Sequence, residues 1–161
     1  MLYHAVEYNT EMQPDLPESY YLDNVLTLFE HVTRVYADLL ETRQLDFLDG
    51  FAALCPDARK LCIRLLNRSH DWYRSSKLKY PEIESLDAAI EALARQGFVE
   101  VNAGIDQPTL LSLFTMAELR ALMPQQPGWD KLRREELEAA LLEQDDSALF
   151  DRLKNSDNLL Q

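Results

Sequence analysis

Residues 56–80, PDARKLCIRLLNRSHDWYRSSKLKY, combine a predicted helix with the most basic segment of the chain. This segment holds seven cations and two acids, for a net charge of +5. Residues 1–55 carry two cations against ten acids, and residues 81–161 carry seven against sixteen. Because the whole chain has a net charge of −12, this basic segment indicates a localised contact with a polyanion, and nucleic acid is the first candidate.

The basic residues on the predicted helix follow its period. Lys60, Arg64 and Arg68 are spaced by four, which puts them in one stripe on a helix surface. Like charges at this spacing cost about 0.2–0.5 kcal/mol per pair, so an anion between them is expected. Leu61 and Leu65 mark an opposite, apolar face that packs. The anion is either an external phosphate or a carboxylate from the acidic flanks of the chain.

Aromatic residues follow the stripe. Trp72 and Tyr73 lie among three further cations, and aromatic rings among cations can stack on bases or flank a phosphate path. Trp72 and Tyr80 also suit core positions, and that alternative stays open. The candidate nucleic-acid contacts in this segment are Lys60, Arg64, Arg68, Arg74, Lys77 and Lys79.

A second, smaller group of candidate contacts opens a helix near the C-terminus. Lys131 and Arg133 are its members. Three glutamates follow within five residues of Arg133, so by charge alone this face is a mixed, solvent-exposed one.

Helices are expected over most of the chain, because apolar residues recur at helical spacing and only four glycines are present. Ser85 is a predicted N-cap, Gly97 a predicted C-cap, and Thr115 with Glu118 a predicted capping box. Short strands are expected at residues 77–80 and 98–101. The expected helices cover about residues 20–39, 44–54, 56–67, 85–97, 115–124, 132–143 and 146–154.

The order of these elements predicts two domains after a lead-in over residues 1–18. A helix, a glycine and a short strand end many winged-helix domains, which favours such a domain with a short β-wing over residues 19–103. Residues 102–108 read as a linker. Two short helices around a Pro/Gly loop then form a helix-extended-helix hairpin, which with its tail covers residues 104–161.

Several kinds of active site have no sequence candidate. There is no Asp/Glu-x-Lys, no Gly-rich phosphate loop and no Gly-x-Ser-x-Gly. Cys55 and Cys62 are not in a Cys-x-x-Cys pair, so no metal site and no catalytic residue are predicted. No run of about 18 apolar residues exists, so no membrane partner is expected. The expected location is the cytoplasm, with the nucleoid or a nucleus if DNA is the ligand.

Three motifs together resemble a known family. They are YYL at 20–22, RKLCIRLLNR at 59–68 followed by Trp72, and KLKYPEI at 77–83. This pattern is similar to the N-terminal region of the Fanconi-associated nuclease family, and the resemblance covers about residues 19–143. It implies a mainly α fold: a winged-helix-like domain with a short β-wing, followed by a SAP-type DNA-binding hairpin.

The resemblance also implies a ligand. In this family the region holds duplex DNA beside a flap or nick, in nucleases of interstrand cross-link repair. The implied partner is therefore branched or flap double-stranded DNA, held by its phosphates without base readout. Arg64 and Arg68 would stand at the basic DNA-contacting positions. Ser69 departs from the pattern, because the family often has Lys there.

Family members continue into a VRR-type nuclease domain with a Glu-x-Lys core, for which Mg or Mn is implied. That core has no counterpart in this sequence, so no cofactor and no cutting activity are expected of this chain alone. The alternative function is a protein-interaction module. In that case the basic stripe docks an acidic surface, either on the family's nuclease domain or on a second copy.

Overall fold

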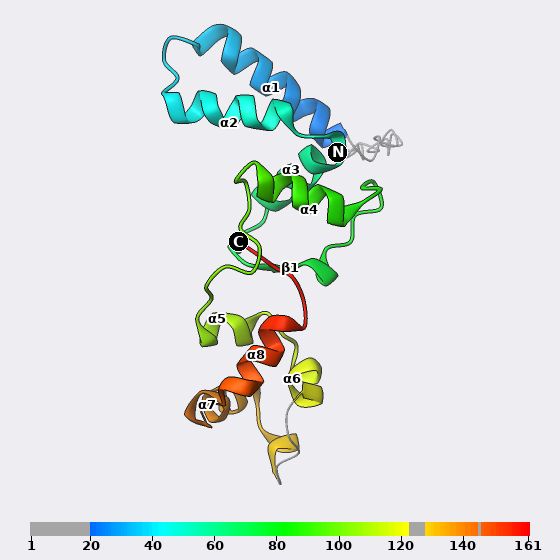
Figure 1. Cartoon of the computed structure of the whole chain (residues 1–161), viewed down its shortest axis with the longest axis vertical. Coiled ribbons are helices and arrows are strands. Elements are labelled where there is room, and N and C mark those ends of the chain that lie inside the picture. The colour runs from blue at the N-terminus through cyan, green and yellow to red at the C-terminus, as the bar shows by residue number, and fades with distance from the viewer. Residues whose placement is uncertain (1–19, 123–127, 145) are drawn as a thin grey trace, which may run out of the picture. The chain divides into compact units, whose positions relative to one another are not determined.

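A computed structural model describes residues 20–122, 128–144 and 146–161. The fold is mainly α-helical, as predicted, and its described residues hold one two-stranded sheet (Figure 1). The chain divides into two compact units, residues 1–48 and 49–161. The predicted lead-in over residues 1–18 and most of the predicted Pro/Gly loop lie outside the described residues.

The first unit is a helical hairpin. Helix α1 spans Tyr20–Tyr36, and helix α2 begins within this unit and spans Thr42–Ala53. The rings of Phe29 and Phe47 meet edge to face, with centroids 6.0 Å apart. The first helix ends earlier than the expected residue 39, because the chain turns through residues 37–39.

The second unit begins with a pair of helices that follows the sequence predictions closely. Helix α3 spans Pro56–Leu66, with its proline in the first turn, and helix α4 spans Leu86–Arg95. The Ser85 hydroxyl accepts a hydrogen bond from the amide of Ala88, which confirms the predicted N-cap. Gly97 has φ +73° and the Phe98 amide donates to the Leu93 carbonyl, which confirms the C-cap as a Schellman motif.

The sheet differs from the prediction. Strand β1, Tyr73–Arg74, pairs antiparallel with strand β2, Leu159–Leu160. The predicted strand at 77–80 is wrong: Ser75–Lys77 form a 3-10 turn, η1, and no strand follows. Of the predicted strand at 98–101, Val101 alone forms a bridge, and its partner is Leu160. Leu159 and Leu160 are fully buried, so their burial decides which residues form the sheet.

Five short helical segments complete the second unit. They are α5 Gln107–Ser112, α6 Met116–Leu122, the 3-10 turn η2 Trp129–Lys131, α7 Arg134–Gln144 and α8 Ser147–Asn155. The predicted capping box is confirmed, because the Thr115 amide donates to Glu118 at 2.8 Å and the Glu118 amide donates to the Thr115 hydroxyl at 3.3 Å.

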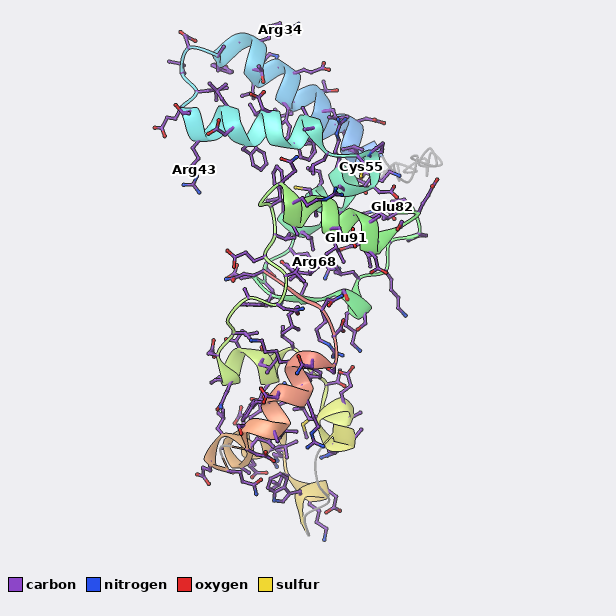
Figure 2. All side chains as sticks on the ribbon, in the orientation of Figure 1. Arg34, Arg43, Cys55, Arg68, Glu82 and Glu91 are labelled. Atoms are coloured by element: carbon purple, nitrogen blue, oxygen red, sulfur yellow. The ribbon has the colours of Figure 1, made fainter. Side chains whose placement is uncertain are left out.

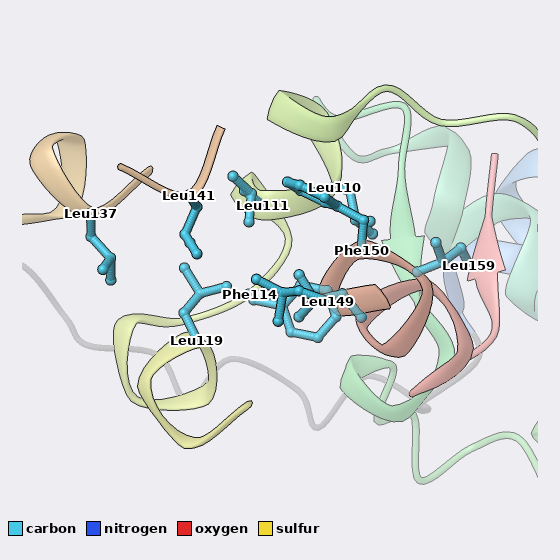
Figure 3. Close-up of a cluster of buried hydrophobic side chains, with 10 residues drawn as sticks. Leu110, Leu111, Phe114, Leu119, Leu137, Leu141, Leu149, Phe150 and Leu159 are labelled. Carbon is cyan, nitrogen blue, oxygen red and sulfur yellow. The ribbon is translucent and has the colours of Figure 1, made fainter. Parts of the chain in front are cut away.

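These helices share one apolar core, which Figure 3 shows around Phe114 and Leu149. Leu159 of β2 belongs to the same core. The amides of Glu100 and Gln161 each donate to the other's carbonyl at 2.9 Å. The end of the chain thus returns to the residues before the predicted linker, and residues 49–161 form one compact unit. The domain boundary expected at 103/104 stays a prediction.

Candidate nucleic-acid interface

Helix α3 and the loop after it present the basic segment of the chain. The apolar face of α3 is buried through Ala58, Leu61, Cys62 and Ile63. Lys60 and Arg64 lie on the helix, and Arg68 lies two residues beyond its end. The predicted stripe therefore exists, with its last member in the turn rather than on the helix.

A carboxylate lies within the stripe. Glu82, which Figure 2 labels, is only 5% exposed. It accepts hydrogen bonds from Arg64 Nε at 2.8 Å and Arg64 Nη2 at 2.6 Å. Lys60 Nζ donates to the backbone carbonyl of the same residue at 2.7 Å. The anion expected between the cations is thus, in this structure, a side chain of the protein. Arg64 keeps 39% of its side chain exposed, whereas Lys60 keeps 19%.

Asp57 joins α3 to the start of α4. Its carboxylate accepts from the amides of Glu84 and Ser85 at 3.0 and 3.1 Å, and from Lys60 Nζ at 3.3 Å. Burial acts to raise the pKa of Asp57, but the Ser85 amide, Lys60 and the Glu84 amide together hold it below its ordinary value. Lys60 therefore stabilises the loop that carries Glu82, and most of its side chain is shielded from solvent.

Two tyrosine rings support the outer part of the stripe. The Arg68 guanidinium lies 5.4 Å from the ring centroid of Tyr73 and 5.6 Å from that of Tyr80. Arg64 lies 5.5 Å from the same Tyr80 ring. Guanidinium groups at such distances from an aromatic face are held by cation–π attraction, yet Arg68 remains exposed. The two rings thus hold the Arg68 guanidinium in a fixed, solvent-accessible position.

Tyr73 and Tyr80 are half-buried and belong to the site as much as to the core. The Tyr73 hydroxyl donates to the carbonyl of His70. Burial raises the pKa of Tyr73, with Arg68 opposing and Asp71 adding to the rise. The Tyr80 hydroxyl is buried without a hydrogen-bond partner among the described residues.

Lys77 and Lys79 point outward on either side of Leu78, which is 4% exposed. Lys77 Nζ lies 2.7 Å from a carboxylate oxygen of Glu118, while 52% of its side chain stays exposed. Lys79 is exposed. Both lysines are therefore positioned to reach a phosphate.

Arg74 does not fit the role that the sequence suggested. Its side chain is 8% exposed, and its guanidinium lies 4.0 Å from the ring centroid of Phe114. Its Nε lies 3.2 Å from Asp157 and its Nη1 3.0 Å from Glu118. Because two carboxylates and a ring enclose this charge, Arg74 is corrected from a candidate DNA contact to a structural ion pair.

Glu118 joins the basic loop to the C-terminal helices. Lys77 and then the Thr115 amide lower the pKa of Glu118 to about 2, against an opposing effect of burial. The same carboxylate pairs with Arg74, so one residue of a capping box also anchors two cations.

Lys131 and Arg133 are exposed on the α6–α7 side of the second unit. They lie apart in sequence from the α3 stripe. Arg134 beside them is structural, because it donates to the carbonyls of Phe114 and Leu111 at 2.6 and 2.8 Å. Lys131 and Arg133 stay candidate contacts.

Other chemistry finds little support in the described part of the chain. No group of three or more His, Cys, Asp or Glu side chains there could hold a metal ion. Burial raises the pKa of Cys62 to about 11, so this thiol is a core residue. No described helix is both long and apolar enough to cross a bilayer.

Sequence reasoning missed Glu82 as the partner of Arg64 and could not place the tyrosine rings. Glu82 belongs to the KLKYPEI motif, but nothing in that motif identifies Arg64 as its partner. The contact itself spans 18 residues, which no helical period reveals.

Comparison with known proteins identifies relatives of this chain by sequence. A family model described as "FAN1, HTH domain" matches residues 19–100. A Fanconi-associated nuclease 1 homolog of Pseudomonas aeruginosa is 32% identical over 125 residues, covering 77% of this chain and 22% of that protein. A homolog from Arabidopsis thaliana is 31% identical over 95 residues, covering 59% of this chain and 10% of that protein.

Two solved structures also match the fold of this chain. A crystal structure of paFAN1 bound to 2-nucleotide 5′ flap DNA with a gap superposes with a TM-score of 0.72 and 27% identity, over 92% of this chain and 28% of that one. A second, with 1-nucleotide 5′ flap DNA, gives a TM-score of 0.65 and 26% identity, over 86% of this chain and 29% of that one. This chain thus spans less than a third of the proteins it resembles.

Proposed function

Because this chain belongs to the Fanconi-associated nuclease family, we propose that it is the DNA-binding region of a structure-selective repair nuclease and holds the duplex beside a 5′ flap. The region matched by the family model includes α3, both tyrosines and Lys79. Two structural relatives contain 5′ flap DNA, which supports flap DNA as the partner.

The observation that carries this proposal is the exposed Arg68 guanidinium over the rings of Tyr73 and Tyr80. A guanidinium offers several donors in one plane and is weakly hydrated, so it suits the oxygens of a phosphate. Arg64 beside it shares the Tyr80 ring, which puts two such groups on one surface. Arg68 is exposed, whereas Arg74 is buried and paired with two carboxylates.

The proposed binding is to the DNA backbone. Four cations can reach phosphates from this surface: Arg64, Arg68, Lys77 and Lys79. Each phosphate neutralised adds about −0.9 to the slope of log affinity against log salt for duplex DNA. Arg68, Lys77 and Lys79 therefore predict a slope of about −2.7 for the parent chain, in which Glu82 holds Arg64. Contacts of this kind fix position and carry no sequence information. Lys131 and Arg133 would extend the contact along the duplex.

Cleavage is not assigned to the residues described here. The Mg or Mn that the family's nuclease chemistry implies finds no cluster of ligands among them, and no step proposed for this chain involves a metal ion. In a full-length nuclease this region would hold the duplex arm while another part cuts. Service in interstrand cross-link repair, and a place in the nucleoid or nucleus, follow from that role.

The test is fluorescence anisotropy with a labelled 5′ flap duplex at several salt concentrations. Arg68→Ala should weaken binding several-fold and reduce the salt slope by about 1. Arg152→Ala, which removes an exposed arginine of α8, is the matched control and should leave both values unchanged. Equal losses in the two variants, or no binding by the parent chain at low salt, would contradict the proposal.

The alternative function, docking of the stripe onto an acidic protein surface, has support in the Arg64–Glu82 pair. That pair demonstrates that the stripe accepts a carboxylate. If the partner were a second copy, sedimentation would detect salt-sensitive self-association that Arg68→Ala weakens. The same preparation would then fail to bind flap DNA.

A further inference from the structure

The hairpin of residues 20–48 has an apolar face that no described residue of its own unit covers. Among the described residues, six of the eight large apolar side chains that stand exposed belong to this hairpin. Single exposed apolar residues are common on protein surfaces, but a group of them on one small unit marks an interaction site. The six are Tyr20, Leu28, Val35, Tyr36, Leu39 and Leu45.

The arrangement of this face suits a helix. On α1, Leu28, Val32 and Val35 follow one another at spacings of four and three. Leu39 lies in the turn after α1 and is not part of this helical stripe. This spacing is the apolar stripe that a partner helix meets in helix-in-groove binding. Leu28 is 55% exposed and Val35 is 47% exposed, so the stripe is open to a partner.

A hollow adjoins the stripe. It has a volume of about 500 Å³ and lies between α1 and α2. Leu28, Phe29 and Val32 line it from α1, and Leu40, Phe47 and Leu48 line it from the turn and from α2. Glu41 and Arg43 are charged members of its lining, and Figure 2 labels Arg43 on α2. The hollow can receive one apolar side chain of a docked helix.

The charge of the hairpin selects the occupant. Residues 20–48 contain five acids against two cations, for a net charge of −3. A second copy would bring the same negative charge, and residues 1–19 hold four acids and no lysine or arginine. Both are disfavoured by like-charge repulsion. We propose that this apolar face docks an amphipathic helix with basic flanks, supplied by a partner protein. The proposal does not depend on DNA binding by the α3 surface.

The test uses the full chain and a dye-labelled 18-residue peptide of leucine and lysine, with the leucines at helical spacing. A peptide of the same composition with scrambled leucine positions is the reference for general electrostatic attraction. Anisotropy is measured with the parent chain, with Leu28→Asp, and with Leu66→Asp. Leu66 is 60% exposed on α3, so Leu66→Asp adds the same charge on an exposed apolar site outside the hairpin.

The sign of the change separates docking from simple attraction. Both variants make the chain more negative than its net −12, so a cationic peptide held by charge alone binds each of them slightly more tightly. Docking on the apolar face instead predicts a loss of roughly tenfold or more in Leu28→Asp and none in Leu66→Asp.

Three results would overturn the proposal. One is equal binding of the patterned and scrambled peptides. Another is binding to Leu28→Asp as tight as to Leu66→Asp. The third is dimerisation of the parent chain in sedimentation that Leu28→Asp abolishes, since this result would assign the face to a second copy.

Discussion

Replacing Glu82 with glutamine should strengthen DNA binding while it weakens the fold. Glu82 holds Arg64 through two short hydrogen bonds, and its side chain is almost fully buried. Any phosphate that binds Arg64 must therefore compete with this carboxylate. Glutamine keeps one oxygen acceptor for Arg64 but removes the charge, so the guanidinium becomes available as a full positive charge.

Both magnitudes can be worked out from these contacts. One additional phosphate neutralised steepens the salt slope by about 0.9, which corresponds at ~0.1 M salt to a gain of up to roughly eightfold in affinity. Hydrogen bonds to charged groups contribute about 1.5–3 kcal/mol, and since glutamine retains part of the interaction, the free energy of unfolding should fall by about 1–2 kcal/mol. Tighter binding by a less stable protein is a combination that general damage to the fold does not produce.

The assay combines flap-DNA anisotropy over a range of salt concentrations with urea denaturation followed by circular dichroism. Glu84→Gln is the matched control, because it removes an equal charge from an exposed residue two positions away. That control should change affinity only slightly and leave the salt slope as it was. If Glu82→Gln lost stability with no gain in affinity, Arg64 would be a structural residue and the reasoning on the stripe would be refuted.

Three further predictions concern the same framework. Tyr80→Phe keeps the ring beside Arg64 and Arg68 and removes a buried hydroxyl without a described partner. The affinity for DNA should therefore stay unchanged, and the free energy of unfolding should rise by about 1 kcal/mol. Tyr80→Leu removes the ring and should lower the affinity several-fold in the same anisotropy assay. The folded-state pKa of Glu118 is about 2 against an ordinary 4.5, so its contribution to stability is complete above pH 4.5 and is lost as the pH falls toward 2. Urea denaturation at pH 7 and pH 3 should therefore reveal a fall of about 1–2 kcal/mol in the free energy of unfolding, after allowance for solvent screening. Glu118→Gln should lack this fall. Leu159→Ala should cost about 2–5 kcal/mol because the side chain is fully buried, and thermal melting should detect it; a change as small as that of exposed Leu66→Ala would mean that β2 adds little to the core.

Much of the local structure followed from residues close together in the chain. Pro56 at the start of α3, the Ser85 cap of α4 and its Gly97 end, and the Thr115–Glu118 capping box were each encoded within a few positions. Each depends on hydrogen bonds between neighbours, so a linear pattern contains the information. The family resemblance rested on the same kind of local motif and is confirmed over residues 19–100.

The pairing of the sheet could not be predicted in this way. Tyr73 pairs with Leu160, far away in sequence, and two short strands leave no alternating pattern long enough to read. The composition of residues 77–80 suited a strand, but the strand formed at Tyr73–Arg74 instead. Its partner residues Leu159 and Leu160 are fully buried there. Because burial outweighs the weak local preference for a strand, the tertiary structure decided the pairing.

The sequence by itself determined that this protein is helical, that it belongs to a nuclease family, and that its positive charge is concentrated in residues 56–80. Helical spacing and local capping motifs identified the helices, the family motifs identified the family, and residue counts located the positive charge. Only the tertiary structure decided the surroundings of each cation. Arg68 is exposed over two rings, Arg64 is shared with Glu82, and Arg74 is enclosed by Glu118 and Asp157. The same side chain serves recognition or stability according to whether the fold leaves it in water or surrounds it with carboxylates, and that depends on residues up to 83 positions away.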